Sequence, residues 1–219
     1  MNWKCIAAAT LAVGSLIQPR DAGATNPQQL EMDEYLFPGQ ALRSTNCRYT
    51  ATMQGDGQFV VRDVTTGGVL WMAPDVYGGG YMKNWAWGYI QIFGWDDVAV
   101  WEAGYWSTNA PLIQTNNGEV ISQSSSIWWR SYNTGSSVPN CNGSYPSVAK
   151  TQVYEGKDLW GADYDWLEVP QFSHCGYHCA VDSGCDAWTY YQGWCYLKQG
   201  QLPSLSTLSG ATSGIIERG

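Results

Sequence analysis

The chain has 219 residues, with 11 Lys and Arg against 19 Asp and Glu, so its formal net charge is −8. An acidic balance of this size argues against nucleic acid and anionic membrane surfaces as partners. Only 14% of the residues are charged, whereas 13 Trp and 14 Tyr supply flat amphipathic rings, which serve protein cores and sugar-stacking faces alike.

The first 24 residues have the features of a secretory signal. Lys4 precedes an apolar run from Cys5 to Ile17, and the small residues Ala22-Gly23-Ala24 follow. The run is too short to span a bilayer, so an uncleaved membrane anchor is the less favoured alternative. We therefore expect residues 1–24 to be a signal peptide, with no transmembrane segment in the rest of the chain. The protein should be secreted and extracellular or attached to a cell surface.

The cysteine count agrees with an oxidising compartment. Of seven cysteines, Cys5 falls within the signal segment, which leaves an even set. The remaining six are Cys47, Cys141, Cys175, Cys179, Cys185 and Cys195. An even set in a secreted chain predicts disulfides.

Residues 25–132 form the first predicted domain, which should be nearly all β. Short apolar or alternating runs are broken by Gly, Asn and Asp, and no helical period is sustained. Three times an alternating strand leads through a turn to a tryptophan: from Gln54 to Trp71, from Phe93 to Trp106, and from Thr115 to Trp129. This degenerate repetition predicts three pseudo-repeated sheets.

The first copy carries the candidate binding row. In an extended strand Gln54, Asp56, Gln58, Val60 and Arg62 would share one face. Amide and carboxylate groups supply the donors and acceptors that vicinal hydroxyls need, and the C–H face of a sugar ring could rest on the valine. An exposed polar strand without a ligand is the plain alternative.

This row also carries a family resemblance. With Tyr35-Leu36-Phe37-Pro38-Gly39-Gln40-Ala41-Leu42 before it, the stretch resembles the first subdomain of the monocot bulb-type, mannose-binding lectins, whose motif is Gln-x-Asp-x-Asn-x-Val-x-Tyr. Gln54, Asp56 and Val60 match, whereas Gln58 replaces the asparagine and Arg62 the tyrosine. The resemblance implies a β-prism II-like domain with a tryptophan from each subdomain near its axis. The residues in those places would be Trp71, Trp106 and either Trp128 or Trp129.

The later copies keep the motif poorly. The five positions become Phe93, Trp95, Asp97, Ala99 and Trp101 in the second copy, and Thr115, Asn117, Glu119, Ile121 and Gln123 in the third. The second copy could bind sugar by stacking on Trp95 and Trp101 beside Asp97. The third could bind through the polar pair Asn117 and Glu119. For each, the alternative is a strand that has lost its site.

Residues 133–151 are predicted to be a linker, because the stretch is rich in Ser, Asn, Gly and Pro. Asn142-Gly143-Ser144 is an N-glycosylation acceptor triplet, which suits an exposed segment of a secreted protein.

Residues 152–219 form the second predicted domain. Cys175 and Cys179 are four apart, so a helix through Gln171 to Asp182 would carry both on one face and could be stapled twice to the strands beyond. A metal site formed by His174, Cys175, His178 and Cys179 is the alternative, which an oxidising compartment disfavours.

This second domain resembles the PAN/apple module in its short form. The residues that carry the resemblance are the Cys-x3-Cys pair, Gly184-Cys185-Asp186-Ala187-Trp188-Thr189-Tyr190 and Cys195-Tyr196-Leu197-Lys198. The resemblance implies a small disulfide-stapled α+β fold with the pairs Cys175–Cys195 and Cys179–Cys185. The cysteines still unassigned, Cys47 and Cys141, could then form a bridge that ties the linker to the first domain.

The expected function is that of a secreted, non-enzymatic, lectin-like carbohydrate-binding protein without a cofactor or metal. Its partners would be glycans or a cell-wall polysaccharide, and an oligomer would raise the avidity of weak sites. The second domain could target a polysaccharide or a protein through Trp160, Tyr190, Tyr191 and Trp194. A structural or adhesive extracellular protein with degenerate sugar sites, which binds proteins through the PAN module, is the alternative. A glycoside hydrolase would need a fixed pair of carboxyls, and nothing arranges Asp96, Asp97 and Glu102 as one.

Overall fold

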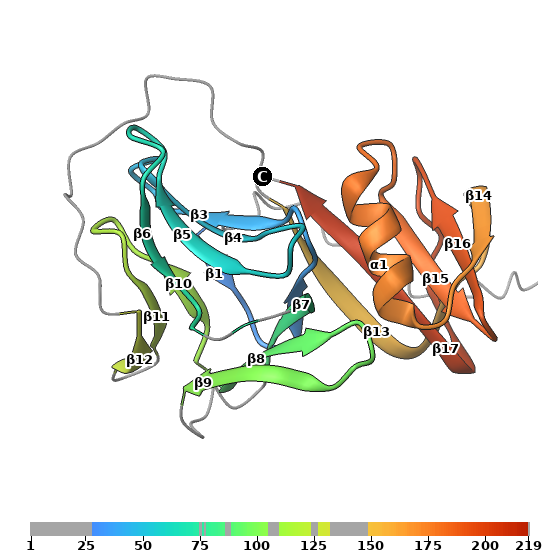
Figure 1. Cartoon of the computed structure of the whole chain (residues 1–219). Helices are drawn as coiled ribbons and strands as arrows, with labels where there is room; N and C mark the ends of the chain where they lie inside the picture. Colours follow the sequence, from blue (N-terminus) through green and yellow to red (C-terminus); the bar gives the residue numbers. More distant parts are fainter. Residues whose placement is uncertain are drawn as a thin grey trace, which may run out of the picture.

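The computed structural model describes residues 28–74, 76, 78–85, 89–104, 110–123, 127–131 and 149–218 (Figure 1). The predictions for residues 1–24, Trp106, Cys141 and Asn142 lie outside this part, as do the side chains of Trp128 and Trp129. Among the described residues, no helix has the length and apolar character needed to cross a bilayer.

The first domain consists of three groups of four antiparallel strands, which confirms the mainly β, triplicated architecture. The first group is β3 (Ala41–Arg43), β4 (Tyr49–Met53), β5 (Phe59–Asp63) and β6 (Val69–Met72). The second is β2 (Glu34–Leu36), β7 (Gly79–Asn84), β8 (Tyr89–Gly94) and β9 (Ala99–Gly104). The third is β1 (Gln29–Leu30), β10 (Leu112–Gln114), β11 (Val120–Gln123) and β12 (Ile127–Arg130).

The three groups enclose one apolar core, because alternate residues of each strand point inward. Phe59 and Val61 from the first group meet Met82 and Ile92 from the second and Leu112 from the third. Trp71 packs against this core, with its ring centroid 6.2 Å from that of Trp101 and 6.3 Å from that of Phe59. Packing is therefore the role of Trp71.

The second domain is a five-stranded antiparallel sheet with one helix across a face (Figure 1). Its elements are β13 (Ala149–Leu159), β14 (Asp163–Glu168), α1 (Phe172–Val181), β15 (Ala187–Tyr191), β16 (Trp194–Lys198) and β17 (Leu205–Arg218). Across the sheet the order is β14-β16-β15-β17-β13. The helix is the one predicted through Gln171 to Asp182.

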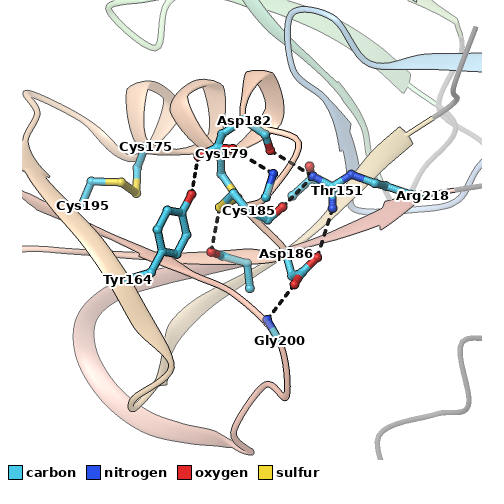
Figure 2. Close-up of a disulfide and its surroundings, with 12 residues drawn as sticks. Thr151, Tyr164, Cys175, Cys179, Asp182, Cys185, Asp186, Cys195, Gly200 and Arg218 are labelled. Atoms are coloured by element: carbon cyan, nitrogen blue, oxygen red, sulfur yellow. Dashed lines mark hydrogen bonds and ion pairs between the residues drawn. A yellow bond between two sulfur atoms is a disulfide. The ribbon is translucent and has the colours of Figure 1, made fainter.

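Two disulfides hold α1 to its surroundings: Cys175–Cys195 joins it to β16, and Cys179–Cys185 joins it to the following loop (Figure 2). Both pairings are those that the PAN resemblance implies, and they leave no free thiolate in the His174–Cys179 stretch for a metal. Arg218 Nη2 donates to the carbonyl oxygens of Cys185 (2.6 Å) and Asp182 (3.2 Å), so the last strand is tied to the same loop. Cys47 is also disulfide-bonded, and its partner lies outside the described residues.

Strand β13 joins the two domains. It pairs with β17 along its length, and near its start it also pairs with β2 (Thr151 with Tyr35, Gln152 with Glu34) and with β3 (Ala149 with Ala41). Residues 149–151, expected as the end of the linker, therefore belong to a strand shared by both domains.

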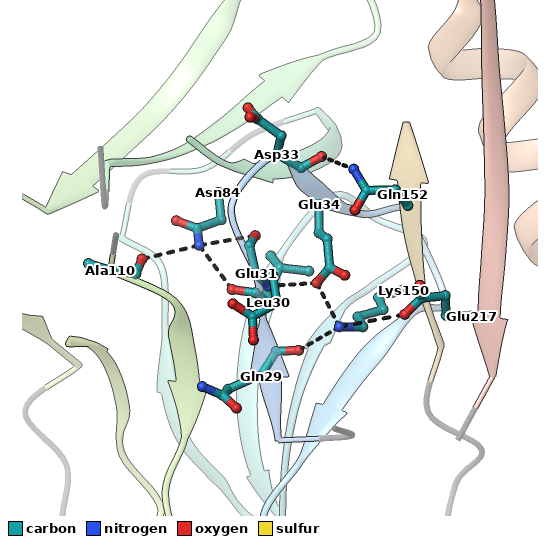
Figure 3. Close-up of polar contacts among 10 residues, drawn as sticks. All are labelled: Gln29, Leu30, Glu31, Asp33, Glu34, Asn84, Ala110, Lys150, Gln152 and Glu217. Atoms are coloured by element: carbon teal, nitrogen blue, oxygen red, sulfur yellow. Dashed lines mark hydrogen bonds and ion pairs between the residues drawn. The ribbon is translucent and has the colours of Figure 1, made fainter. Parts of the chain in front are cut away.

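A buried ion pair lies at this joint (Figure 3). Lys150 Nζ is 2.7 Å from Glu34 Oε2, with both side chains at most 7% exposed, and it also donates to the carbonyl of Gln29 at 3.3 Å. Burial raises the pKa of Glu34, against the opposing charge of Lys150. Nearby, Asn84 Nδ2 donates to the carbonyls of Leu30 (2.9 Å) and Ala110 (3.3 Å), so one amide links the second strand group to the third.

Candidate carbohydrate-binding site

The start of the first-copy row is a hairpin turn rather than an extended strand. Gln54 N donates to Gln58 O at 2.7 Å, and Gly57 N donates to Gln54 O at 3.0 Å. Gly57 has φ +86°, a conformation that glycine adopts without steric cost. The strand itself begins at Phe59, so the expectation of one regular strand from Gln54 is wrong. The turn nevertheless brings three of the five predicted side chains together.

These three side chains form a connected polar chain. Arg62 Nη2 donates to Gln54 Oε1 at 2.6 Å, and Gln54 Nε2 donates to Asp56 Oδ1 at 3.4 Å. The backbone N of Gln58 also donates to Asp56 Oδ1, at 3.1 Å. Asp56 is exposed, and within the described residues its Oδ2 accepts no hydrogen bond. The guanidinium therefore fixes the amide, the amide orients the carboxylate, and one carboxylate oxygen faces solvent.

Gln58 and Val60 are less available than the sequence suggests. Gln58 Nε2 donates to the carbonyl of Val76, and Val60 is only 1% exposed. The chain after β6 returns past the hairpin so closely that a Cβ on Gly57 would lie 2.3 Å from the backbone N of Gly79. A sugar ring cannot rest on Val60 in this arrangement, so that part of the prediction is corrected.

The equivalent turns in the other copies fix the register of the motif. In the second copy Gly94 N donates to Val98 O (2.8 Å), and in the third Thr115 N donates to Glu119 O (2.8 Å). Gly57, Asp97 and Gly118 hold the same turn position, each with positive φ. The third copy aligns as predicted, but the second is one residue off. Its motif positions are Gly94, Asp96, Val98, Val100 and Glu102.

Trp95 and Trp101 therefore do not form the expected surface on which a sugar could stack. Trp101 points into the core beside Trp71, whereas the Trp95 ring lies 4.9 Å from His174 and 5.4 Å from Tyr177 of α1. Asp97 also turns toward α1, and its burial there raises its pKa, although contacts with Tyr81 and Ser173 partly oppose this shift. These aromatic and acidic groups of the second copy serve core packing and the contact between the domains.

The third copy does bring its predicted pair together. Asn117 Nδ2 donates to Glu119 Oε2 at 3.0 Å, and Arg130 Nη1 lies 3.4 Å from Glu119 Oε1. Glu119 is only 7% exposed, so this carboxylate mainly contacts Asn117 and Arg130 and is little available to a ligand. Arg130 is a site residue that sequence reasoning missed. The sequence carries no signal for it, because its position follows from the pairing of β12 with β11, which sets Arg130 opposite Ile121.

No family model matches the sequence, and no curated protein matches it. Among solved structures it is similar to a lectin from Marasmius oreades (17% identity, TM-score 0.45, covering 52% of this chain and 94% of that chain). It is also similar to a monomeric monocot mannose-binding lectin from Gastrodia elata (19%, 0.42, 49% and 98%). A third is the Polygonatum cyrtonema lectin complexed with monomannoside (21%, 0.41, 47% and 94%). About half of this chain has no counterpart in these three structures.

Proposed function

We propose that the chain is a secreted, non-enzymatic, lectin-like protein that binds a mannose-type or wall-polysaccharide glycan at the hairpin Gln54–Arg62. The observation that carries the proposal is the polar chain Arg62–Gln54–Asp56, which ends on an exposed carboxylate. A carboxylate accepts hydrogen bonds from two adjacent hydroxyls, and the Gln54 amide supplies a donor beside it. Arg62 stands where the motif has tyrosine, and it holds the amide in place.

The site is shallow, so single-site binding should be weak. Each hydrogen bond at an exposed site nets about 0.5–1.5 kcal/mol, so three of them give about 1.5–4.5 kcal/mol, which corresponds to a dissociation constant of about 1 mM at best. Gln58 would have to leave the Val76 carbonyl to contribute a fourth. Useful affinity for a glycan-coated surface then requires several sites or an oligomer.

The test is a glycan array with mannose and oligomannose as the first probes, run on the wild type and on Asp56→Ala. Asp96→Ala is the matched control, since Asp96 Oδ1 accepts from Val98 N at 3.2 Å in the equivalent turn of the second copy. We expect Asp56→Ala to weaken binding about tenfold or more, which is the effect of losing about 1.4 kcal/mol. Asp96→Ala should bind like the wild type. Wild type that binds no glycan, or undiminished binding by Asp56→Ala, would refute the site.

A structural or adhesive extracellular role is the second candidate. This role is favoured because Gln58 donates to the Val76 carbonyl and Val60 is buried, so neither is available to a sugar. It is also favoured because the second copy does not keep the motif. In this role the second domain, as a PAN/apple-like module, would bind a protein. An array negative for every glycan, together with a stable folded protein, would favour this candidate.

A further inference from the structure

The second domain carries four aromatic side chains on the sheet face opposite α1. Pairing of the adjacent strands places Trp166 of β14 opposite Tyr196 of β16, and Trp194 of β16 opposite Tyr191 of β15. The intervening residues Leu167, Cys195 and Tyr190 belong to the core under α1. Because side chains alternate along a strand, the four rings point the other way. We call Trp166, Tyr191, Trp194 and Tyr196 the aromatic platform.

The two indoles of the platform are open to solvent. Trp166 is 62% exposed and Trp194 is 42% exposed. In the part of the chain that the structure describes, neither ring stacks on another ring and neither indole N–H donates a hydrogen bond. Each indole therefore presents an apolar ring face and a free N–H donor, the combination that suits a ligand with both C–H faces and hydroxyl groups.

The platform has definite limits. Beyond Tyr196 the next residue in the row, Thr189, is buried, with its hydroxyl 2.7 Å from Ser213 Oγ. At one end Lys198 Nζ is covered by the carbonyl of Gly161 (3.2 Å) and by Asp163. From strand spacings the open area is roughly 10 Å by 7 Å, which is the size of a few sugar rings rather than of a protein interface.

The chemistry around the rings narrows the choice of ligand. The position across from Trp194 on β14 is the exposed carboxylate of Glu168, and Gln192 Nε2 donates to Tyr191 Oη at 3.1 Å. The groups around the rings are polar, and no aliphatic residue stands at the paired positions. The platform therefore lacks the close-packed apolar pocket that is typical of a hot spot in a protein–protein interface. The Glu168 carboxylate and the net charge of −8 disfavour an acidic polymer or a second copy of this chain.

We propose that the aromatic platform binds a neutral polysaccharide. Pyranose rings would stack on Trp166 and Trp194, while Glu168 accepts and the indole N–H groups donate hydrogen bonds to hydroxyls. This site lies on the second domain and does not depend on the hairpin Gln54–Arg62.

The test is co-sedimentation of the full chain with insoluble cellulose, chitin and β-1,3-glucan, beside polygalacturonate as an acidic polymer. We expect the wild type to bind at least one neutral polymer and Trp166→Ala/Trp194→Ala to bind it about tenfold more weakly or worse. Trp160→Ala is the matched control, because Trp160 is 82% exposed but lies outside the platform. It should bind like the wild type. Asp56→Ala disables the proposed hairpin site and should keep the part of the binding that the platform provides, which separates the two sites.

A second measurement uses the unaltered chain. N-bromosuccinimide oxidises exposed indoles, and peptide mass spectrometry locates the modified residues. Soluble hydroxyethylcellulose or β-1,3-glucan should protect Trp166 and Trp194 and leave Trp160 reactive. The proposal is overturned if no neutral polymer binds, if only polygalacturonate binds, or if neither indole is protected. It is also overturned if the double variant binds fully, or if its main effect is to dissociate a dimer.

Discussion

Asp97 and His174 meet where the β8–β9 turn packs against the first turn of α1. Burial raises the pKa of Asp97, and burial followed by the charge of His178 lowers the pKa of His174, which the Asp97 carboxylate partly opposes. Asp97 Oδ1 and His174 Nδ1 are buried without a hydrogen-bond partner in the described chain. Other groups around Asp97 are Tyr81, Ser173 and Asp96. The pKa of each group is therefore shifted in the direction of its neutral form.

This contact predicts a pH dependence of stability. Because the pKa of His174 is lower in the folded state than its ordinary value of 6.5, the unfolded chain binds more protons as the pH falls through that range. The free energy of unfolding should therefore decrease between about pH 7 and pH 5, and His174→Gln should flatten that decrease. Asp97 acts with the opposite sign, since its raised pKa favours the folded state at low pH. Urea unfolding over this range, with Asp97→Asn for comparison, measures both. A wild-type slope in His174→Gln would contradict the assignment.

Single residues also explain where sequence reasoning succeeded. Strand alternation and the lectin motif grouped Gln54, Asp56 and Arg62, and the structure brings these side chains together through a turn rather than a strand. The same pattern grouped Asn117 with Glu119, which are in contact. The predicted motif positions of the second copy lie one residue too early. The reason is that Asp97, with φ +58°, takes the turn position that glycine fills in the first and third copies. Asp adopts a positive φ more readily than most residues, but an Asp in the sequence does not by itself predict a turn at that position. Burial of Val60 could not be predicted, because alternation along the strand placed this side chain on the exposed face with Gln58 and Arg62.

Helix α1 meets the first domain through a glycine. A Cβ on Gly176 would lie 2.3 Å from Phe37 Cζ, so the helix approaches the ring more closely than any other residue would allow. Phe37 is fully buried, and its ring centroid lies 6.1 Å from that of Trp188.

This close approach predicts that Gly176→Ala destabilises the protein. Alanine favours a helix by about 1 kcal/mol, but overpacking against a fixed ring costs about 1–3 kcal/mol, so the net change should be unfavourable. In a Phe37→Leu background, which removes the ring, the same substitution should cost less or stabilise. Thermal unfolding of the four chains gives the coupling. A stabilising Gly176→Ala in the wild-type background would refute the contact.

Local signals set most elements, whereas the joint between the domains depends on distant residues. Alternation predicted the strands and a cysteine spacing predicted α1. The PAN resemblance implied both disulfide pairs. The pairing of β13 with β2 could not be foreseen, because the sequence near residue 149 has the composition of a linker and its partner lies more than a hundred residues earlier. Amino-acid composition indicates only the local conformational preference of a segment. The pairing of β13 with the edge of a sheet in the first domain is a long-range contact, so composition cannot predict it.

At the scale of the whole molecule, the ion pair between Lys150 and Glu34 should report on the joint. Lys150→Met would leave the Glu34 carboxylate buried without its cation, which costs about 3–5 kcal/mol. Replacing both residues, as in Lys150→Met/Glu34→Leu, should recover most of that loss. Differential scanning calorimetry should show one transition that moves as a unit, because β13 belongs to both domains. Two transitions, with only one of them shifted, would contradict this picture.

The shared strand also bears on how the two proposed binding surfaces could work together. A flexible tether would let each surface search for its ligand, at an entropic cost whenever both became occupied. Backbone hydrogen bonds between β13 and β2 instead hold the hairpin Gln54–Arg62 and the aromatic platform at one distance and one orientation. Simultaneous attachment would then select among glycan-coated surfaces by the spacing and direction of their chains, and not by sugar identity alone.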